Sequence, residues 1–248
     1  MTVKPVAPSH LALPESVRAA LVDSRQKRVH EHGIGVDTKW WNAALRERRL
    51  SGGPMLGSDP ANDRQPRISL TRGAVFELAR PVAQGDPTDE EVLRLLWHAL
   101  AWGSGGRYRQ DHTRMDAFRE TTGGSENIDL LRRAAAAAQT DPRDAYGLLI
   151  RRGGGVIDGL GPSFFTKFLY FAGAGEVGHP CAILDARVAT ALHRGGWGNL
   201  PAGWSNWYTD TYVSYCELLT RWAREEGRRL DRHVGIDEIE RGLFDAGA

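Results

Sequence analysis

Apolar residues recur at helical spacing along almost the whole chain, and no stretch of useful length alternates apolar and polar residues as a half-buried strand does. Residues 89–103 are apolar on nearly every side, which predicts a central helix. Thr88 and Glu91 form a capping box at its start. The sequence predicts an all-α protein of roughly nine or ten helices. Further helices are expected over residues 13–32, 37–50, 69–81, 125–139, 141–152, 183–194, 208–227 and 235–247.

Residues 51–67 are rich in Gly, Pro, Asn and Asp, which indicates a loop or linker. We therefore divide the chain into an N-terminal helical segment with its linker, residues 1–67, and a helical core, residues 68–248. The sequence leaves open whether the N-terminal segment stands apart or packs back onto the core.

Composition excludes several classes of protein. A net charge of +1 means that any site for a polyanion has to be a local patch. The two cysteines, Cys181 and Cys216, are too few for a disulfide framework, and the histidines show no metal-ligand spacing. We expect two buried thiols, no catalytic metal and, since neither a signal peptide nor a membrane-spanning run is present, a cytoplasmic protein.

The stretch "GLGPSFFTKFLYF", residues 159–171, predicts a tight turn that leads into an apolar helix. We expect a short helix to end at Asp158, Gly159 and Gly161 to form the turn, and Pro162 to begin the next helix. The free N–H groups at that helix start can hold a DNA phosphate without reading sequence. An ordinary turn between two helices is the alternative.

Lys167 places an ammonium in the middle of this apolar helix, in a chain that otherwise prefers arginine: the other lysines are only Lys4, Lys27 and Lys39. An arginine cannot replace a nucleophilic lysine because it stays protonated. Further along, Asp185 follows an apolar run and precedes an amphipathic helix. It is either a plain N-cap or a carboxylate held beside a cleft.

These motifs resemble the helix-hairpin-helix DNA glycosylase superfamily, and within it the 8-oxoguanine DNA glycosylase-like branch. The resemblance lies in the glycine turn at 159–163 and in the apolar-apolar-Asp pattern at 183–185, and it covers roughly residues 70–240. It implies a bilobal helical domain with one helix-hairpin-helix motif, an active site in the cleft between lobes, and base flipping. The chain departs from the pattern at Ser163, where lyase members of the superfamily carry their lysine.

The resemblance implies that Asp185 stabilises the positive charge that develops on the sugar. Three roles for Lys167 stay open. It reaches back from one helical turn away and attacks C1′, which gives AP-lyase activity as well. Alternatively, Asp185 activates water and Lys167 pairs with a carboxylate or phosphate. In the third case Lys167 only snorkels to the surface.

The resemblance also implies which residues meet DNA. The segment 101–112 sits where the superfamily probes the duplex opposite the damaged base, although a glycine C-cap and a solvated loop would look the same. Tryptophans after the aspartate helix are candidates for a base pocket, and core packing is equally compatible. The predicted DNA contacts are Gly159, Gly161, Ser163, Trp102, Gly103, Ser104, Arg107, Arg109 and Arg187, and the pocket candidates are Trp197, Trp204 and Trp207.

We therefore expect a monomeric DNA glycosylase that acts on double-stranded DNA and needs no cofactor, with a monovalent cation at the hairpin carbonyls left open. The favoured substrate is 8-oxoguanine, a choice that rests on the resemblance alone. A hypermodified base of foreign DNA, released by a monofunctional glycosylase, is an alternative. So are a non-catalytic helix-hairpin-helix DNA-binding protein and an unrelated helical enzyme acting on a small molecule.

Overall fold

The computed structural model describes residues 6–58, 67–106, 108, 110–152, 154–203 and 206–248. Helices dominate it, as predicted, but two short sheets correct the all-α expectation. In chain order the elements are α1 (Glu15–Ala20), the π-helix η1 (Gln26–His30), β1 (Gly33–Asp37), α2 (Thr38–Glu47), β2 (Arg67–Thr71), α3 (Arg72–Gln84), α4 (Asp89–Ser104), α5 (Asp111–Asp116), the 3₁₀-helix η2 (Glu120–Thr122), α6 (Gly124–Ala138), α7 (Pro142–Leu149), β3 (Ile150–Arg151), β4 (Gly154–Gly155), α8 (Pro162–Phe171), α9 (Ala186–Arg194), α10 (Thr209–Leu230) and α11 (Ile236–Ala246).

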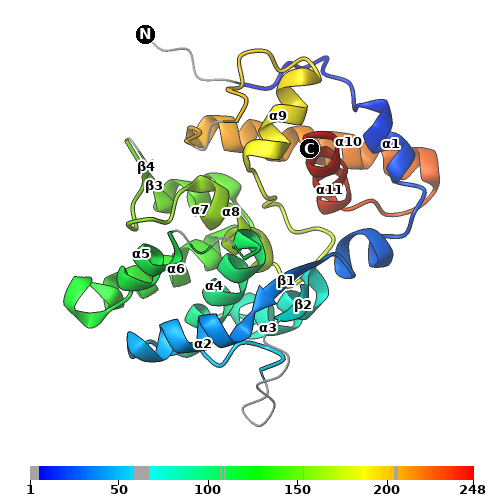
Figure 1. The fold of residues 1–248 in the computed structure, drawn as a ribbon. Coiled ribbons are helices and arrows are strands. Elements are labelled where there is room, and N and C mark those ends of the chain that lie inside the picture. The colour runs from blue at the N-terminus through cyan, green and yellow to red at the C-terminus, as the bar shows by residue number, and fades with distance from the viewer. Residues whose placement is uncertain (1–5, 59–66, 107, 109, 153, 204–205) are drawn as a thin grey trace.

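The helices gather in two groups, with α7 and α8 between them (Figure 1). One group contains α1, α9, α10 and α11, in which α11 packs on the other three. The other contains α2 to α6 and both strands of the larger sheet. The cleft that the resemblance implies between two lobes stays a prediction.

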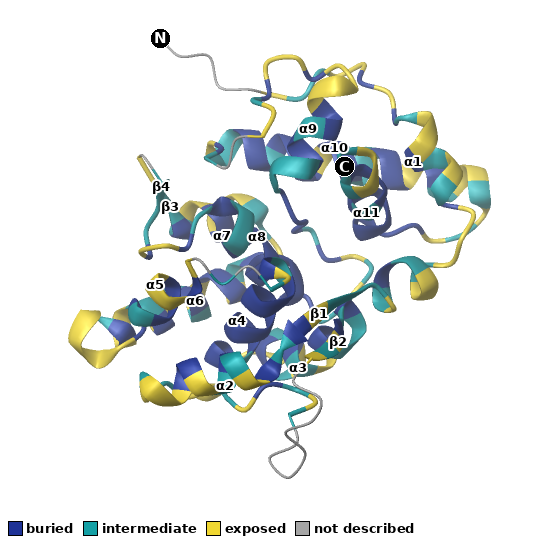
Figure 2. Cartoon of the chain, viewed as in Figure 1, coloured by how far each residue is buried: buried dark blue, intermediate teal, exposed yellow. Residues whose placement is uncertain are grey.

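The central helix of the second group is α4, as the sequence predicts. Its capping box is present, because Thr88 Oγ1 accepts from the Glu91 N–H and the Glu91 carboxylate accepts from the Thr88 N–H. Apolar residues are buried on all its sides, and it packs against α3 and α8 (Figure 2). This all-round burial explains why the sequence shows no polar stripe there.

The larger sheet pairs β1 with β2 antiparallel, with Gly33 opposite Thr71. Two glycines interrupt β1, so it lacks the alternation that would have predicted a strand. The smaller sheet, β3 with β4, lies where a helix ending at Asp158 was expected, and that expectation is wrong. Glycines at 154 and 155 favour the extended pairing over a helix, because glycine is a poor helix former.

Two further helix boundaries differ from the prediction. Residues 13–32 form two short helices, α1 and η1, instead of one. Pro81 does not end α3, which continues to Gln84. From the N-terminal segment, Val17, Leu21 and Val29 are fully buried in the main hydrophobic core.

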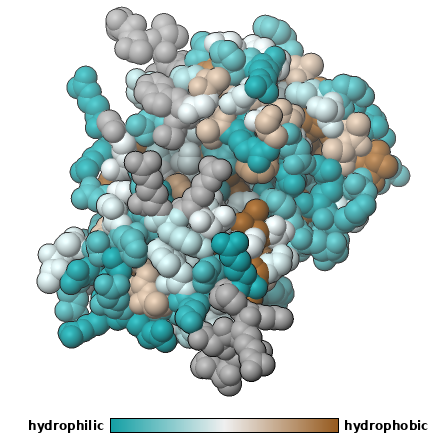
Figure 3. Space-filling model, in the orientation of Figure 1, coloured by the Kyte–Doolittle hydropathy of each residue, from teal (hydrophilic) through white to brown (hydrophobic). Residues whose placement is uncertain are grey.

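The face of the molecule in Figure 3 is largely hydrophilic, with hydrophobic residues in small groups. Among the residues with described positions, the exposed large apolar side chains are Val6, Val22 and Tyr208. None of the described helices combines the length and apolar character that crossing a bilayer requires.

Candidate active site

Lys167 projects from the middle of α8 and is only 5% exposed. Its Nζ donates to the carbonyl oxygen of Ser163 at 2.7 Å and to Asp185 Oδ2 at 3.3 Å. The ring of Phe164 lies 5.6 Å from the same nitrogen. The lysine therefore does not snorkel out to solvent, and its amine is held against a carboxylate that lies 18 residues further along the chain.

Asp185 is the N-cap of α9, and its two carboxylate oxygens bind different partners. Oδ1 accepts from the backbone N–H groups of Arg187 and Val188, both at 3.1 Å. Oδ2 faces Lys167. The N-cap alternative is thus correct for one oxygen, while the other remains free for the lysine.

The extended segment before Asp185 is fixed from two helices. Tyr212 and Tyr215 of α10 donate their hydroxyls to the carbonyls of residues 182 and 183, at 3.0 and 2.7 Å. Thr166 of α8 donates to the carbonyl of Leu184 and accepts from its N–H. All these groups are buried, so these hydrogen bonds fix the position of the extended backbone that leads to Asp185.

The glycine turn precedes α8 as predicted. Gly159 has φ +73°, in the left-handed region that favours glycine, and Pro162 is the first residue of α8. The N-cap residue of this helix, Gly161, has no side chain with which to cap it. No such cap therefore occupies the N–H groups of the first turn of α8. The helix before the turn is α7, and the β3–β4 hairpin lies between them; the helix-hairpin-helix motif stays a prediction.

Arg114 of α5 connects this turn to the end of α4. Its Nε donates to the Gly159 carbonyl at 2.9 Å, and its guanidinium carbon lies 3.6 Å from the centre of the Phe164 ring. Its Nη1 donates to Asp111 Oδ1, which also accepts from Ser104 Oγ. Burial raises the pKa of Asp111, and the charge of Arg114 opposes that shift. Sequence reasoning missed Arg114, since an arginine in a short polar helix carries no signal of burial.

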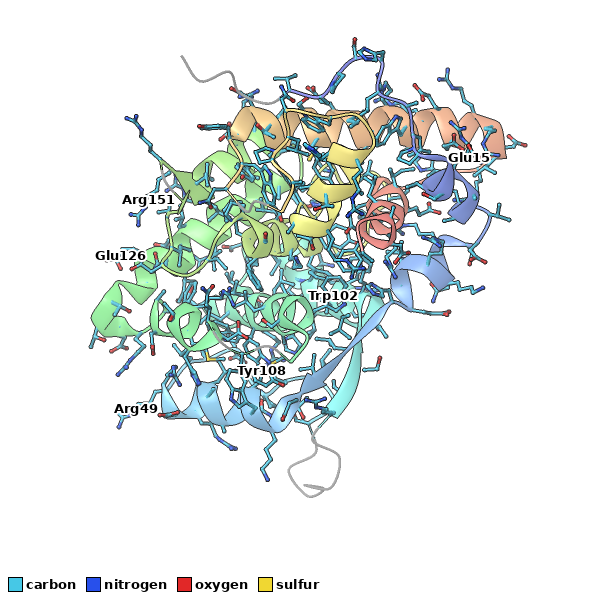
Figure 4. The ribbon with its side chains drawn as sticks, turned by 45° about the horizontal axis from the view of Figure 1, so that its top comes forward. Glu15, Arg49, Trp102, Tyr108, Glu126 and Arg151 are labelled. Carbon is cyan, nitrogen blue, oxygen red and sulfur yellow. The ribbon has the colours of Figure 1, made fainter. Side chains whose placement is uncertain are left out.

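The residues predicted to probe the duplex occupy different environments. Trp102 is buried, with the Arg72 guanidinium carbon 4.8 Å from its ring centre and His32 at its edge. Figure 4 shows it well inside the molecule, whereas Tyr108 lies nearer β1 and α2. Ser104 is buried and Gly103 half-buried. Arg107 and Arg109 lie outside the described residues.

The remaining predicted residues surround the aspartate helix. Arg187 is half-buried, and its guanidinium carbon lies 4.1 Å from the centre of the Phe244 ring. Trp197 and Trp207 are buried members of the hydrophobic core, so neither offers an exposed ring. Trp204 lies outside the described residues. A role for these tryptophans in a base pocket stays a prediction.

A further buried ion pair, which sequence reasoning missed, joins α3 to α11. Arg72 of α3 donates to Glu240 of α11 at 2.8 Å and to the Tyr170 hydroxyl of α8 at 3.3 Å. Burial raises the pKa of Glu240; Arg72 opposes this shift, and the charge of Asp185 adds to it. The two partners are 168 positions apart, so no local pattern could have joined them.

The described residues include no group of three or more His, Cys, Asp or Glu side chains arranged to hold a metal ion. Cys181 and Cys216 are free and buried, and burial raises the pKa of the Cys216 thiol to about 12. Neither thiol is therefore a candidate nucleophile.

A sequence model of the family OGG, described as "Putative 8-oxoguanine DNA glycosylase OGG-like protein", matches residues 27–244. This match confirms the resemblance drawn from the glycine turn and the aspartate. No curated protein and no solved structure matches the chain. The matched region contains Lys167, Asp185 and the buried ion pair described above.

Proposed function

The chain belongs to the OGG-like family, whose description is "Putative 8-oxoguanine DNA glycosylase OGG-like protein", and we propose that it is a DNA glycosylase that excises a damaged or modified base. The observation that carries the proposal is the contact of Lys167 Nζ with Asp185 Oδ2 at 3.3 Å beside the uncapped start of α8. A carboxylate can stabilise the charge that develops on the sugar, an amine can attack C1′, and the helix start can bind a phosphate.

In the proposed reaction, the target base is flipped out of the duplex. Lys167 first passes a proton to the adjacent Asp185 and becomes a neutral amine. Its nitrogen forms a bond to C1′ while the bond from C1′ to the base breaks, and the departing base takes up the proton that Asp185 had received. Asp185 returns to its charged form and stabilises the positive charge on the sugar. Ring opening then yields a Schiff base on Lys167, from which strand cleavage proceeds by elimination.

The position of Lys167 agrees with this role although Ser163 occupies the usual place of the nucleophile. The Lys167 amine folds back along α8 and lies 2.7 Å from the backbone oxygen of Ser163. Residues four apart share a helix face, so the amine lies on the same side of α8 as residue 163. The pairing with Asp185 is compatible with the lysine mechanism, which we propose first, and with activation of water by Asp185, which remains the second candidate.

DNA would be held by three groups of residues. Gly159, Gly161 and Ser163 offer the start of α8 to a phosphate, and Arg187 adds a cation beside Asp185. Because Trp102 and Ser104 are buried, the part of the predicted segment that would meet the opposite strand begins at the exposed Gly105. We propose 8-oxoguanine as the first substrate to test, with a hypermodified base of foreign DNA as the alternative. The base preference rests on family membership.

The test is reductive trapping on DNA that contains an abasic site, because this substrate requires no choice of lesion. With borohydride present, the wild type should form a covalent adduct that Lys167→Gln does not form. Lys27→Gln is the matched control, since Lys27 also pairs with an aspartate, Asp23, but is exposed. An adduct that persists in Lys167→Gln, or none in the wild type, would exclude Lys167 as nucleophile and favour water.

A further inference from the structure

Gly103 occupies the last turn of α4, in an ordinary helical conformation where glycine is unfavourable. The helix end does not require it, because Gly105 provides the left-handed C-cap with φ +54°. A glycine here therefore needs another reason, and the close approach of a neighbour is the usual one.

The neighbour is the proposed nucleophile. A Cβ placed on Gly103 would lie 2.8 Å from Cδ and 3.1 Å from Cε of Lys167, and 3.3 Å from Cε1 of Phe164. The first distance is far below van der Waals contact. By comparison, a Cβ on Gly147 in α7 would meet nothing within 4 Å. The aliphatic chain of Lys167 thus fills the space that a side chain at position 103 would take.

Neither neighbour can move aside without losing other contacts. The Lys167 amine is held by the Ser163 carbonyl and by Asp185. The Phe164 ring lies under the guanidinium of Arg114, which is itself bound to the Gly159 carbonyl. A methyl group at position 103 would therefore displace the lysine chain away from the carboxylate.

We propose that Gly103 is a positioning residue, whose missing side chain forms the slot along which Lys167 reaches Asp185. Its importance for catalysis rests on the proposed function, but the slot itself does not. This role differs from the one expected of Gly103 as a flexible part of the DNA-probing segment, which would affect DNA affinity.

The slot is tested by thermal unfolding without DNA. Gly103→Ala should lower the melting temperature of the wild type, because the added methyl meets Lys167. In a Lys167→Ala background the same change should raise it, because the space is vacant and alanine favours the helix. Gly147→Ala, the matched control, should raise it in both backgrounds. If Gly103→Ala lowers the melting temperature equally in both backgrounds, the slot does not exist.

The catalytic consequence is tested by trapping on abasic DNA at saturating concentration. Gly103→Ala should slow adduct formation by about 100-fold, as expected for a nucleophile displaced by roughly 1 Å, while the DNA dissociation constant changes far less. Weaker binding with a normal rate at saturation would overturn the positioning role. If the wild type itself forms no adduct, the proposed reaction fails, and the sign of the melting shift still decides whether Gly103 holds the lysine in place.

Discussion

One ion pair joins Lys167 of α8 to Asp185 at the start of α9, and another joins Arg72 of α3 to Glu240 of α11. The two pairs differ in their exposure and in whether the cation can release its proton. Arg72 and Glu240 are 0% and 1% exposed and 2.8 Å apart. The side chains of Lys167 and Asp185 are 7% and 13% exposed, and their charged groups are 3.3 Å apart. Arginine keeps its proton, whereas lysine can release one to its partner. We therefore assign a structural role to the deeper pair and propose the shallower one for the chemistry.

We expect the largest effect from a substitution that removes the charge of Asp185 but still caps α9. Asp185→Asn should lower the rate of trapping on abasic DNA by about 100-fold or more, measured in single turnover. The cap of α9 should persist, since asparagine is also a good N-cap, so any fall in melting temperature reports the loss of the pairing with Lys167.

The matched control is Asp141→Asn, because Asp141 caps α7 through the same pair of contacts, to the N–H groups of Arg143 and Asp144. It should leave the trapping rate intact. A rate in Asp185→Asn equal to that of this control would mean that Asp185 is a cap and nothing more.

The deeper pair should show the opposite pattern. Glu240→Gln leaves the Arg72 guanidinium without its counter-charge and should cost about 3–5 kcal/mol of unfolding free energy, measured by urea denaturation. Arg72→Met combined with Glu240→Leu should recover most of this loss, since an apolar pair can replace a buried ion pair. A Glu240→Gln variant as stable as the wild type would remove the structural role assigned to this pair.

The stability of the protein should depend on pH through His32, whose ring makes an edge contact with Trp102. Burial, followed by the charges of Arg72 and Arg241, lowers its pKa to about 3. The folded state thus binds fewer protons than the unfolded state below about pH 6.5. The stability that the neutral imidazole contributes is present above that pH and is lost as pH falls toward 3.

Replacing His32 with phenylalanine should therefore reduce the loss of unfolding free energy between pH 7 and pH 4.5, compared by urea denaturation at both values. An unchanged difference between the two pH values would show that His32 takes up protons equally in the folded and unfolded states, and thus that its pKa is not lowered by folding.

The smallest effect is expected at an exposed pair of the same residue types. Lys27 and Asp23 are 3.1 Å apart, with side chains 67% and 49% exposed. Lys27→Gln should change the unfolding free energy by less than about 1 kcal/mol. A larger cost, measured alongside the Glu240 variants, would show that burial does not govern the difference among these pairs.

The sequence predicted most helices and singled out Lys167 and Asp185, which the structure brings into contact, because these predictions depend on local patterns. Thr88 and Glu91 predict the start of α4, and the apolar run that ends at Asp185 predicts an N-cap. Contacts between distant segments left no such signal. The pairing of β1 with β2, the burial of Arg72 and the approach of Gly103 to Lys167 all depend on how helices pack.

The central claim is that Lys167 is the nucleophile, and locating the trapped adduct by mass spectrometry tests it most directly. After reductive trapping on abasic DNA and proteolysis, the sugar remnant should appear on the peptide containing Lys167. The chain has only three other lysines, Lys4, Lys27 and Lys39, so the assignment is unambiguous. A remnant on one of these or on the N-terminal amine, with Lys167 unmodified, would contradict the account.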